Sequence, residues 1–280
     1  MNIGGALGVC AAAKVFLGQT DAPLLVRPYL KSFSRSELFT VMTAGMATTA
    51  SSLMILYATI LEKTIANPVA HILTASIISI PAAITISRLM IPHVGEDTSG
   101  HMVAPYKFNS SMEAVSQGTL TGLDLFLNII ANLIVILALV ALANFMIGCL
   151  PHFDGAPLSL ERMLGFVMAP IAWLMGMPWD EAVFAGGLLG KKAVLNEIVA
   201  FLGLAEMGAT KLSAHSNLIM TYALCGFANL ASIGIQIGAI GTMVPERRSE
   251  IIELGFRALI AGTIASCMSG TIVGLLYWWT

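Results

Sequence analysis

The segment KKAVLNEIVAF, residues 191–201, places a polar pair, Asn196-Glu197, inside an otherwise apolar and Gly-rich region. The nearest cations are Lys191 and Lys192, and no basic residue lies in the turn that follows Glu197. A carboxylate inside a membrane costs roughly 2–3 kcal/mol or more, so it usually faces a wet cavity or a partner. Glu197 is therefore either a loop acid at the membrane interface or a ligand for substrate or ion inside a transport site. We favour the second interpretation, because three further stretches place polar residues in a similar apolar setting.

The composition identifies the class of protein. Hydrophobic residues make up 57% of the chain and charged residues 11%, and the mean hydropathy is +0.84. These values lie far outside the range of soluble domains, and they predict an all-α polytopic membrane protein embedded in a lipid bilayer. The net charge of −2 is uninformative about nucleic acid, and no basic patch suggests it, so we expect no nucleic acid as a partner. The four cysteines stand singly, without metal or disulfide spacing, so we expect no metal and no cofactor.

The N-terminal third begins with a broken apolar stretch. Residues 2–13 are apolar but too short to cross a bilayer, which needs about 20 residues, and a polar turn, residues 18–23, separates them from a second short segment, Leu24–Leu30. This pattern predicts a re-entrant hairpin, with a surface loop as the alternative. The uncharged run between Glu37 and Glu62 is long enough to span, and its middle is rich in Gly, Ala, Thr and Ser. Such a middle either permits close packing of helices or marks a place where the helix unwinds.

The rest of the chain contains a second broken stretch and a second broken span. A polar segment over residues 92–118 predicts the main extramembrane connection, and the third span lies at 125–150. An apolar segment at 163–179 is marginal for crossing, and the pieces on either side of Asn196-Glu197 are again too short. The uncharged run 212–245 contains Asn229 and Ser232, which are three residues apart and share a helix face.

The two halves correspond to each other. We expect the first repeat, with one hairpin and two transmembrane helices, at 1–91, and the second at 154–280, on either side of the connection 92–118 and a transmembrane helix at 119–153. An odd number of crossings between them makes the repeats inverted. Each repeat holds a re-entrant helical hairpin and a broken transmembrane helix, and paired interrupted segments of this kind mark the site of a secondary transporter near the membrane midplane.

Three motifs resemble one known family, the concentrative nucleoside transporters. GQTDAPL at 18–24 is similar to the family's first-hairpin motif, NEIVAF at 196–201 to its second-hairpin motif, and CGFANLASI at 225–233 to its broken seventh helix. The resemblance runs from about residue 3 to the end. Family members normally carry about three more helices before the first hairpin, so the resemblance implies an N-terminally truncated chain. It also implies import of nucleosides by alternating access, a homotrimer, and a multi-pass location in the plasma membrane, which is the inner membrane of a bacterium.

The resemblance also implies roles for individual residues. Gln19 and Thr20, with Asp21 nearby, are placed beside the nucleobase, although the family more often has Glu at the position of Asp21. The remaining substrate-binding residues are Glu197, Asn229 and Ser232, which hold the ribose hydroxyls, and Phe227 and Leu53, which line the pocket. The chemistry agrees, since a sugar diol suits a carboxylate with an amide and a hydroxyl, and a base edge suits the donors and acceptor of a Gln amide.

One departure from the family concerns the coupling ion. Sodium-coupled members carry Asn at the position of Lys14, beside carbonyls at the positions of Leu17 and Thr49 and a hydroxyl at that of Thr48. An ammonium group repels a bound cation strongly at close range in a low dielectric. Of the two ions, H⁺ and Na⁺, we therefore expect H⁺ to be the coupling ion, with uniport as the alternative.

Two functions other than transport are the alternatives. A membrane-embedded enzyme needs a metal-binding or nucleophilic set of side chains, and the sequence has no His-Glu-x-x-His and no paired aspartates on facing spans. An inactive remnant is the other alternative, because the absent N-terminal helices supply the scaffold and trimer contacts in the family. Basic loop residues gather on one side of the assigned spans, which predicts that this side is cytoplasmic.

Overall fold

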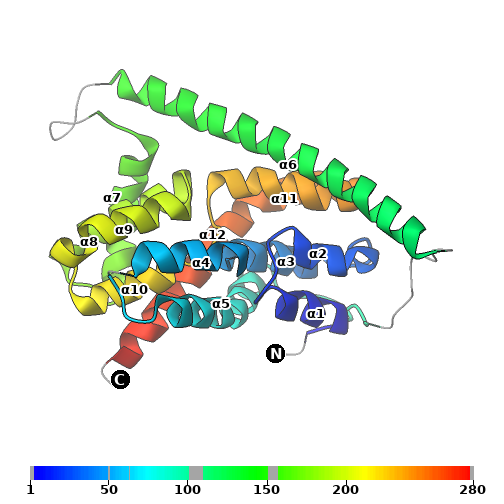
Figure 1. Ribbon diagram of the computed structural model, residues 1–280, viewed down its shortest axis with the longest axis horizontal. Coiled ribbons are helices and arrows are strands. Elements are labelled where there is room, and N and C mark those ends of the chain that lie inside the picture. The colour runs from blue at the N-terminus through cyan, green and yellow to red at the C-terminus, as the bar shows by residue number, and fades with distance from the viewer. Residues whose placement is uncertain (1–2, 50, 63, 101–109, 151–156, 278–280) are drawn as a thin grey trace.

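The computed structural model of the chain describes residues 3–49, 51–62, 64–100, 110–150 and 157–277. Helices joined by turns and short loops account for these residues, and no strand occurs among them. Figure 1 shows a bundle of helices with one long helix, α6, along one side. The all-α fold expected from the sequence is confirmed.

The first repeat contains a hairpin, a broken span and a continuous helix. Its elements are α1 (Gly5–Ala13), α2 (Asp21–Leu25), the 3₁₀ turn η1 (Arg27–Tyr29), α3 (Arg35–Ala47), α4 (Ser51–Leu61) and α5 (Pro68–Met90). α3 ends because Thr48 has an extended backbone, with φ −118° and ψ 160°. The carbonyls of its last turn therefore lack helical partners, as expected where a span is interrupted.

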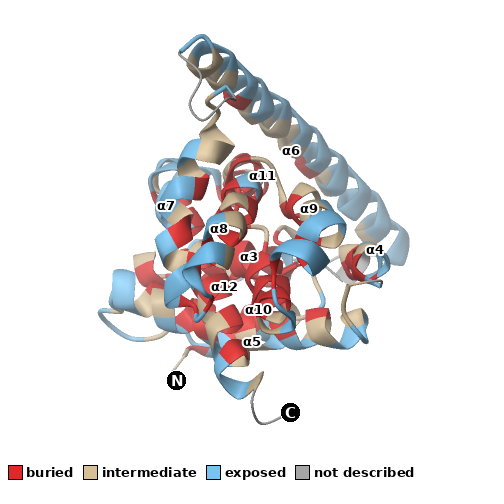
Figure 2. Cartoon of the chain, turned by 90° about the vertical axis from the view of Figure 1, so that its left-hand side faces the viewer, coloured by how far each residue is buried: buried red, intermediate tan, exposed pale blue. Residues whose placement is uncertain are grey.

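The helix between the repeats is longer than the sequence predicted. α6 (Ser111–Gly148) begins where the Ser110 hydroxyl accepts a hydrogen bond from the Glu113 backbone N–H. Residues 111–118, which the sequence assigned to the connection at 92–118, are therefore part of this helix. Only 11% of its most apolar window is buried, and Figure 2 shows most of α6 exposed beside a buried centre formed by the other helices. Its outer surface is free to face lipid or other protein.

The second repeat follows the same order, after one additional helix. Its elements are α7 (Leu160–Leu174), α8 (Trp179–Val194), α9 (Glu197–Lys211), α10 (Ala214–Leu224), α11 (Leu230–Met243), the 3₁₀ turn η2 (Pro245–Arg247) and α12 (Arg248–Leu276). α8 and α9 are the arms of the second hairpin, and α10 and α11 form the second broken span. The apolar segment 163–179 is not one helix, because α7 ends at Leu174 and Gly176 adopts a φ of 103° that favours glycine.

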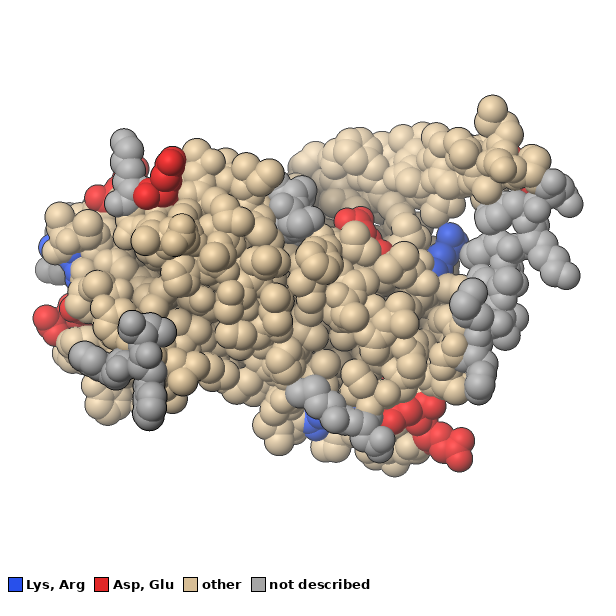
Figure 3. All heavy atoms as spheres, turned by 60° about the horizontal axis from the view of Figure 1, so that its bottom comes forward, with Lys and Arg blue, Asp and Glu red and all other residues tan. Residues whose placement is uncertain are grey.

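The helices fit a multi-pass membrane protein. Within the described ranges, three are long and apolar enough to cross a bilayer, namely Pro68–Met90, Ser111–Gly148 and Pro245–Leu276. The pairs α3–α4 and α10–α11 reach the necessary length of about 20 residues only as pairs, as expected for broken spans. Figure 3 shows charged side chains in small groups, with wide areas between them that carry none.

Ion pairs join the start of α3 to the start of α12. Lys31 lies 3.1 Å from Glu246, and Arg35 lies 2.6 Å from Glu253. Several basic residues of the predicted cytoplasmic side therefore lie at one end of the molecule, and their orientation in the membrane stays a prediction. Four further residues that bear on this orientation, Lys63, Lys107, Trp278 and Trp279, lie outside the described ranges.

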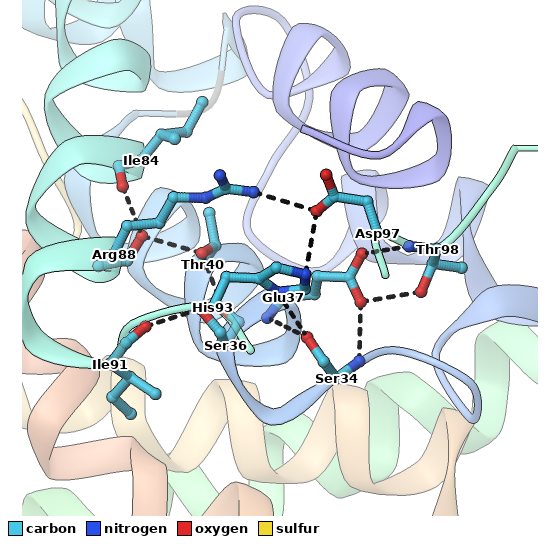
Figure 4. A network of polar contacts seen from close by, with 11 residues as sticks. Ser34, Ser36, Glu37, Thr40, Ile84, Arg88, Ile91, His93, Asp97 and Thr98 are labelled. Atoms are coloured by element: carbon cyan, nitrogen blue, oxygen red, sulfur yellow. Dashed lines mark hydrogen bonds and ion pairs between the residues drawn. The ribbon is translucent and has the colours of Figure 1, made fainter. Parts of the chain in front are cut away.

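A polar network ties the loop after α5 to the first turn of α3 (Figure 4). The Glu37 side chain is buried, and its carboxylate accepts hydrogen bonds from the backbone N–H of Ser34 at 2.8 Å and from both the N–H and the hydroxyl of Thr98 at 2.9 and 2.8 Å. The Ser34 hydroxyl accepts in turn from the Glu37 N–H, which completes a capping box. Burial acts to raise the pKa of Glu37, but these hydrogen bonds outweigh it and hold that pKa below its usual value.

Replacing Glu37 with alanine is expected to destabilise the protein by about 2–3 kcal/mol, since hydrogen bonds to a charged group each contribute roughly 1.5–3 kcal/mol. The lowered folded-state pKa means that this contribution is present above the unfolded pKa and is lost as pH falls through the folded pKa. Thermal unfolding of the purified protein at neutral pH should therefore separate the variant from the parent, and the difference should shrink in acid. Glu206→Ala, at an exposed position on α9, is the control. Equal melting temperatures for parent and Glu37→Ala at neutral pH would contradict this role.

Candidate functional site

The tip of the second hairpin is built from a helix cap. The side chain of Asn196 accepts a hydrogen bond from the Val199 N–H at 2.9 Å and so starts α9. Glu197 is the first residue of that helix, where a negative charge is stabilised by the helix dipole. Its side chain is only 1% exposed. Glu197 is therefore not a loop acid at the surface, and it lies at a polar point inside the bundle.

The Glu197 carboxylate joins the two repeats. Tyr57, on α4 of the first repeat, donates its hydroxyl to Glu197 Oε1 at 2.7 Å, and Asn229 donates its amide to Oε2 at 3.2 Å. Both partners are neutral side chains, and neither lies in the segment around Glu197. Tyr57 is also fixed from the side, because its ring lies 4.9 Å from that of Phe201.

The break between α10 and α11 supplies two of the predicted ligands. The Asn229 side chain is buried and accepts a hydrogen bond from the Ser232 N–H at 2.8 Å, so that Asn229 caps α11. The hydroxyl of Ser232 is buried and has no hydrogen-bond partner. Asn229 is thus in contact with Glu197, and Ser232 is held against Asn229. Phe227, within the break, is partly buried, and so is Leu53 on α4, which packs against the apolar core around Tyr57.

The tip of the first hairpin is shaped by Asp21. Its carboxylate accepts hydrogen bonds from the Gly18 N–H at 3.3 Å and from the Thr20 hydroxyl at 3.1 Å, and Asp21 itself is exposed. Gln19 is 6% exposed, and its amide oxygen has no partner among the described contacts. Of the three residues expected beside a nucleobase, Gln19 therefore offers a buried free acceptor, whereas Asp21 and Thr20 hold the turn.

The interruptions of the two broken helices touch each other. A Cβ atom added at Gly226 would lie 2.9 Å from the carbonyl oxygen of Ala47 and 3.1 Å from that of Met46. The backbone between α10 and α11 therefore packs directly on the last turn of α3, an approach that requires glycine. This contact brings the two interruptions together in the middle of the bundle.

The predicted ion region is only partly assembled. Lys14 is 1% exposed, and its ammonium donates to the carbonyl of Leu17 at 3.4 Å. Thr48 and Thr49 are fully buried, but the Thr48 hydroxyl donates to a carbonyl of its own helix at 2.9 Å. The hydroxyl of Thr49 lies 3.2 Å from that of Ser76 on α5. Lys14 and Leu17 are therefore in contact, and the Thr48 hydroxyl bonds within its own helix. The group expected from Thr49 is its carbonyl, and its role stays a prediction.

Outside this centre, a metal site and a cavity are the features to consider among the described residues. No group of three or more His, Cys, Asp or Glu side chains that could hold a metal ion occurs among the described residues. A cavity of about 1070 Å³ lies between α5, α9, α10 and α12, where His71 Nδ1 is 3.0 Å from the Tyr222 hydroxyl. None of the predicted substrate residues lines it.

Two residues of the centre were not predicted as site residues. Tyr57 stands in an apolar run on α4, and neither its spacing nor its neighbours distinguish it from a core aromatic. Lys192 was noted only as a nearby cation, yet its side chain is 1% exposed, whereas Lys191 beside it is exposed. The helical spacing of apolar residues along α8 could have identified Lys192 as the lysine that faces inward, because Leu188 and Leu189 lie four and three residues before it.

Comparison with known sequences identifies related proteins. Residues 71–274 match the family described as "Na+ dependent nucleoside transporter C-terminus". "Uncharacterized transporter YutK" of Bacillus subtilis is 37% identical over 95% of this chain and 66% of its own length. "Nucleoside permease NupC" of Helicobacter pylori is 37% identical over 98% and 68%, and "Solute carrier family 28 member 3" of Homo sapiens is 36% identical over 96% and 41%. The chain thus spans from 41% to 68% of the length of these relatives, which are transporters or permeases and not enzymes.

Solved structures are similar over nearly the whole chain. CNTnw in an inward-facing substrate-bound state has a TM-score of 0.77 at 34% identity, and the match covers 99% of this chain and 66% of that chain. A CNTnw variant in an outward-facing state has a TM-score of 0.87 at 34% identity, covering 99% and 67%. Further CNTnw variants are described as intermediate states, with TM-scores between 0.77 and 0.82. The fold of hairpins and broken helices in two inverted repeats is therefore shared with these structures.

Proposed function

The chain belongs to the family of Na⁺ dependent nucleoside transporters, and from this premise we propose that it is a secondary active transporter that imports nucleosides across the plasma membrane. The observation that carries the proposal is the Glu197 carboxylate, which is buried at a hairpin tip and held by Tyr57 of one repeat and Asn229 of the other. The buried Ser232 hydroxyl and Gln19 amide oxygen, both without partners, are free to bind a polar ligand.

The chemistry of these groups fits the two halves of a nucleoside. A ribose diol has two hydroxyl donors, which suit the carboxylate of Glu197, while the Asn229 amide and the Ser232 hydroxyl supply further donors and acceptors. The amide oxygen of Gln19 suits a donor on the base edge. Leu53 and Phe227 provide apolar surface for the ring. Asp21 and Thr20 support this arrangement by holding the hairpin turn in which Gln19 stands.

Alternating access is the proposed mechanism. The similar structures include inward-facing, intermediate and outward-facing states of one protein, and this chain gives a higher TM-score with the outward-facing variant (0.87) than with the inward-facing state (0.77). The hairpin tips and the two helix interruptions would move as one unit past α6, which packs on this unit mainly through α11 and leaves most of its own surface exposed. A homotrimer in the plasma membrane, the inner membrane in a bacterium, is the proposed assembly.

Proton coupling is favoured over sodium coupling. The ammonium of Lys14 is buried and already bonded to the Leu17 carbonyl, so a fixed positive charge stands where sodium-coupled members of the family place their ion region. Like charges at such distances repel strongly in a low dielectric. Asp21 and Glu197 are the carboxylates near the two hairpin tips that would take up a proton in one facing state.

Uptake of radiolabelled uridine tests the function, and competition by deoxynucleosides tests the ribose assignment. We expect uridine to compete at least tenfold better than its 2′,3′-dideoxy analogue, since leaving buried polar groups such as Asn229 and Ser232 unpaired costs about 1–3 kcal/mol. 2′-Deoxyuridine, which lacks only the 2′-hydroxyl, should fall between them. Equal competition by uridine and the dideoxy analogue would count against the ribose site. Absence of both uptake and binding would instead favour the alternative of an inactive remnant.

A further inference from the structure

Lys192 is a buried cation that the proposed transport cycle does not yet use. It lies in the last turn of α8 and is 1% exposed. Its ammonium donates to the carbonyl oxygen of Ala223 at 2.7 Å and to the hydroxyl of Ser266 at 2.9 Å. No carboxylate lies within ion-pair distance of it among the described contacts. An ammonium away from water is strongly unfavourable unless hydrogen bonds compensate it, so these two short bonds are what hold it in place.

The Ala223 carbonyl lies where α10, the first half of the second broken helix, ends. α10 stops at Leu224, so the Ala223 carbonyl has no partner farther along the helix. The C-terminal end of a helix also carries a partial negative charge that attracts a cation. The ammonium of Lys192 therefore ties the first arm of the hairpin to the start of the interruption that leads to Asn229.

The position of Ser266, the second acceptor for Lys192, has an equivalent in the first repeat. Ala75-Ser76-Ile77-Ile78-Ser79 on α5 corresponds to Ala265-Ser266-Cys267-Met268-Ser269 on α12. The hydroxyls of Ser79 and Ser269 lie 3.0 Å apart, as expected for equivalent residues beside a pseudo-two-fold axis. Ser76 is then the counterpart of Ser266. Ser76 contacts the broken helix of its own repeat through Thr49, and Ser266 contacts Lys192.

The two hairpins also correspond in their charges. Lys14 stands five residues before Gln19, and Lys192 stands five residues before Glu197. Each lysine is 1% exposed and lies at the C-terminal end of the first arm of its hairpin. Each second arm begins with an acid in its first turn. Lys192 is therefore the counterpart of Lys14 in the second repeat, and unlike Lys14 it reaches the broken helix directly.

We propose that Lys192 is a positioning residue for substrate recognition, a tethered cation that fixes the α10–α11 interruption against the second hairpin so that Asn229 and Glu197 face a ribose together. The proposal rests on the proposed nucleoside transport. Without the ammonium, the Ala223 carbonyl loses its partner, and the hairpin tip is free to shift relative to the interruption. The Asn229–Glu197 contact of 3.2 Å spans that junction. Ribose recognition is then weakened, while contacts of the base with the first hairpin are unchanged.

The test measures how strongly the purified protein discriminates uridine from 2′,3′-dideoxyuridine. Equilibrium binding of both ligands is measured for the parent, for Lys192→Met, which keeps the length of the side chain, and for the control Lys191→Met at the exposed neighbouring position. We expect Lys192→Met to lose at least tenfold in affinity for uridine, with little change for the dideoxy analogue, so that the ratio of affinities falls toward one. Lys191→Met should keep the parent ratio. A role limited to folding would lower both affinities together.

Two further variants test the proposal, one of them also in the case that Lys192→Met does not fold. Ser266→Ala removes one of the two acceptors and should reduce the ratio by a smaller factor, which decides the question if Lys192→Met does not fold. Adding Lys192→Met to Glu197→Gln should bring no further loss of uridine affinity, since residues that act as a unit are not additive. A parent ratio in Lys192→Met, or in Ser266→Ala where it alone folds, overturns the proposal. If the parent protein itself does not bind uridine, the proposed function fails instead.

Discussion

Replacing Glu197 with glutamine is expected to lower the affinity for uridine by about 10- to 100-fold and to reduce uptake correspondingly. Hydrogen bonds to a charged acceptor contribute roughly 1.5–3 kcal/mol each, and every 1.4 kcal/mol corresponds to a factor of about ten in affinity. The variant should still insert into the membrane and purify as a folded protein, because the side chain keeps its size and its place at the start of α9.

The structure explains why glutamine is a poor substitute here. The Glu197 carboxylate accepts from the Tyr57 hydroxyl at 2.7 Å and from the Asn229 amide at 3.2 Å. A glutamine side chain has one oxygen acceptor and one NH₂ donor, so one of these two donors would face another donor. The ribose hydroxyls would then meet an altered Asn229 as well as a neutral side chain at position 197.

The measurement is equilibrium binding of uridine to the purified protein, followed by uptake in reconstituted vesicles. Glu206→Gln is the matched control, because it makes the same chemical change at an exposed position on the same helix, α9. Uridine binding to Glu197→Gln at the affinity of the parent would remove Glu197 from the ribose site.

The outline of the fold could be predicted from the sequence, because polar residues mark the places where its apolar segments are interrupted. Polar tips such as Asn196-Glu197 and the turn at 18–23 stand in apolar surroundings, and a membrane tolerates such breaks only where protein or water covers them. The start of α6 was placed too late, since Ser111 begins the helix within a stretch whose polar composition is typical of a loop. Helix capping by Ser110 and Glu113 decided that boundary, and hydropathy does not detect it.

The candidate site was predictable only in part. Polar residues in apolar stretches, their spacing and the family resemblance indicated Asn229, Ser232 and Glu197, and the structure connects them through Asn229. The partner of Glu197 was not predicted, because Tyr57 lies 140 positions away in the sequence, and contacts of that range depend on how the two repeats pack. The different roles of Gln19 and Asp21 in the first hairpin were not predicted either. Asp21 bonds to its own turn, a local geometry that the motif does not specify.

Sodium is expected to have no effect on uptake by the unmodified protein. Lys14 does not extend toward the membrane surface, because it is 1% exposed and bonds to the Leu17 carbonyl at 3.4 Å. Its ammonium therefore already supplies a positive charge beside the first hairpin, and it engages a carbonyl that corresponds to a sodium ligand in sodium-coupled members of the family. Replacing sodium with choline in energised vesicles should leave uridine uptake unchanged, and dissipating the pH gradient with a protonophore should abolish accumulation.

Lys14→Asn is the variant expected to reverse this behaviour. Asparagine removes the fixed charge and frees the Leu17 carbonyl, and its own carbonyl oxygen adds a neutral ligand of the kind that a hard cation prefers. Uptake by this variant should depend on sodium by several-fold, with the Thr48 hydroxyl leaving its helical carbonyl to complete the site. Lys31→Asn, which alters an exposed lysine paired with Glu246, should remain indifferent to sodium. Clear sodium stimulation of the unmodified protein would show that the Lys14 ammonium does not replace the ion, and the proposed preference for protons would then be abandoned.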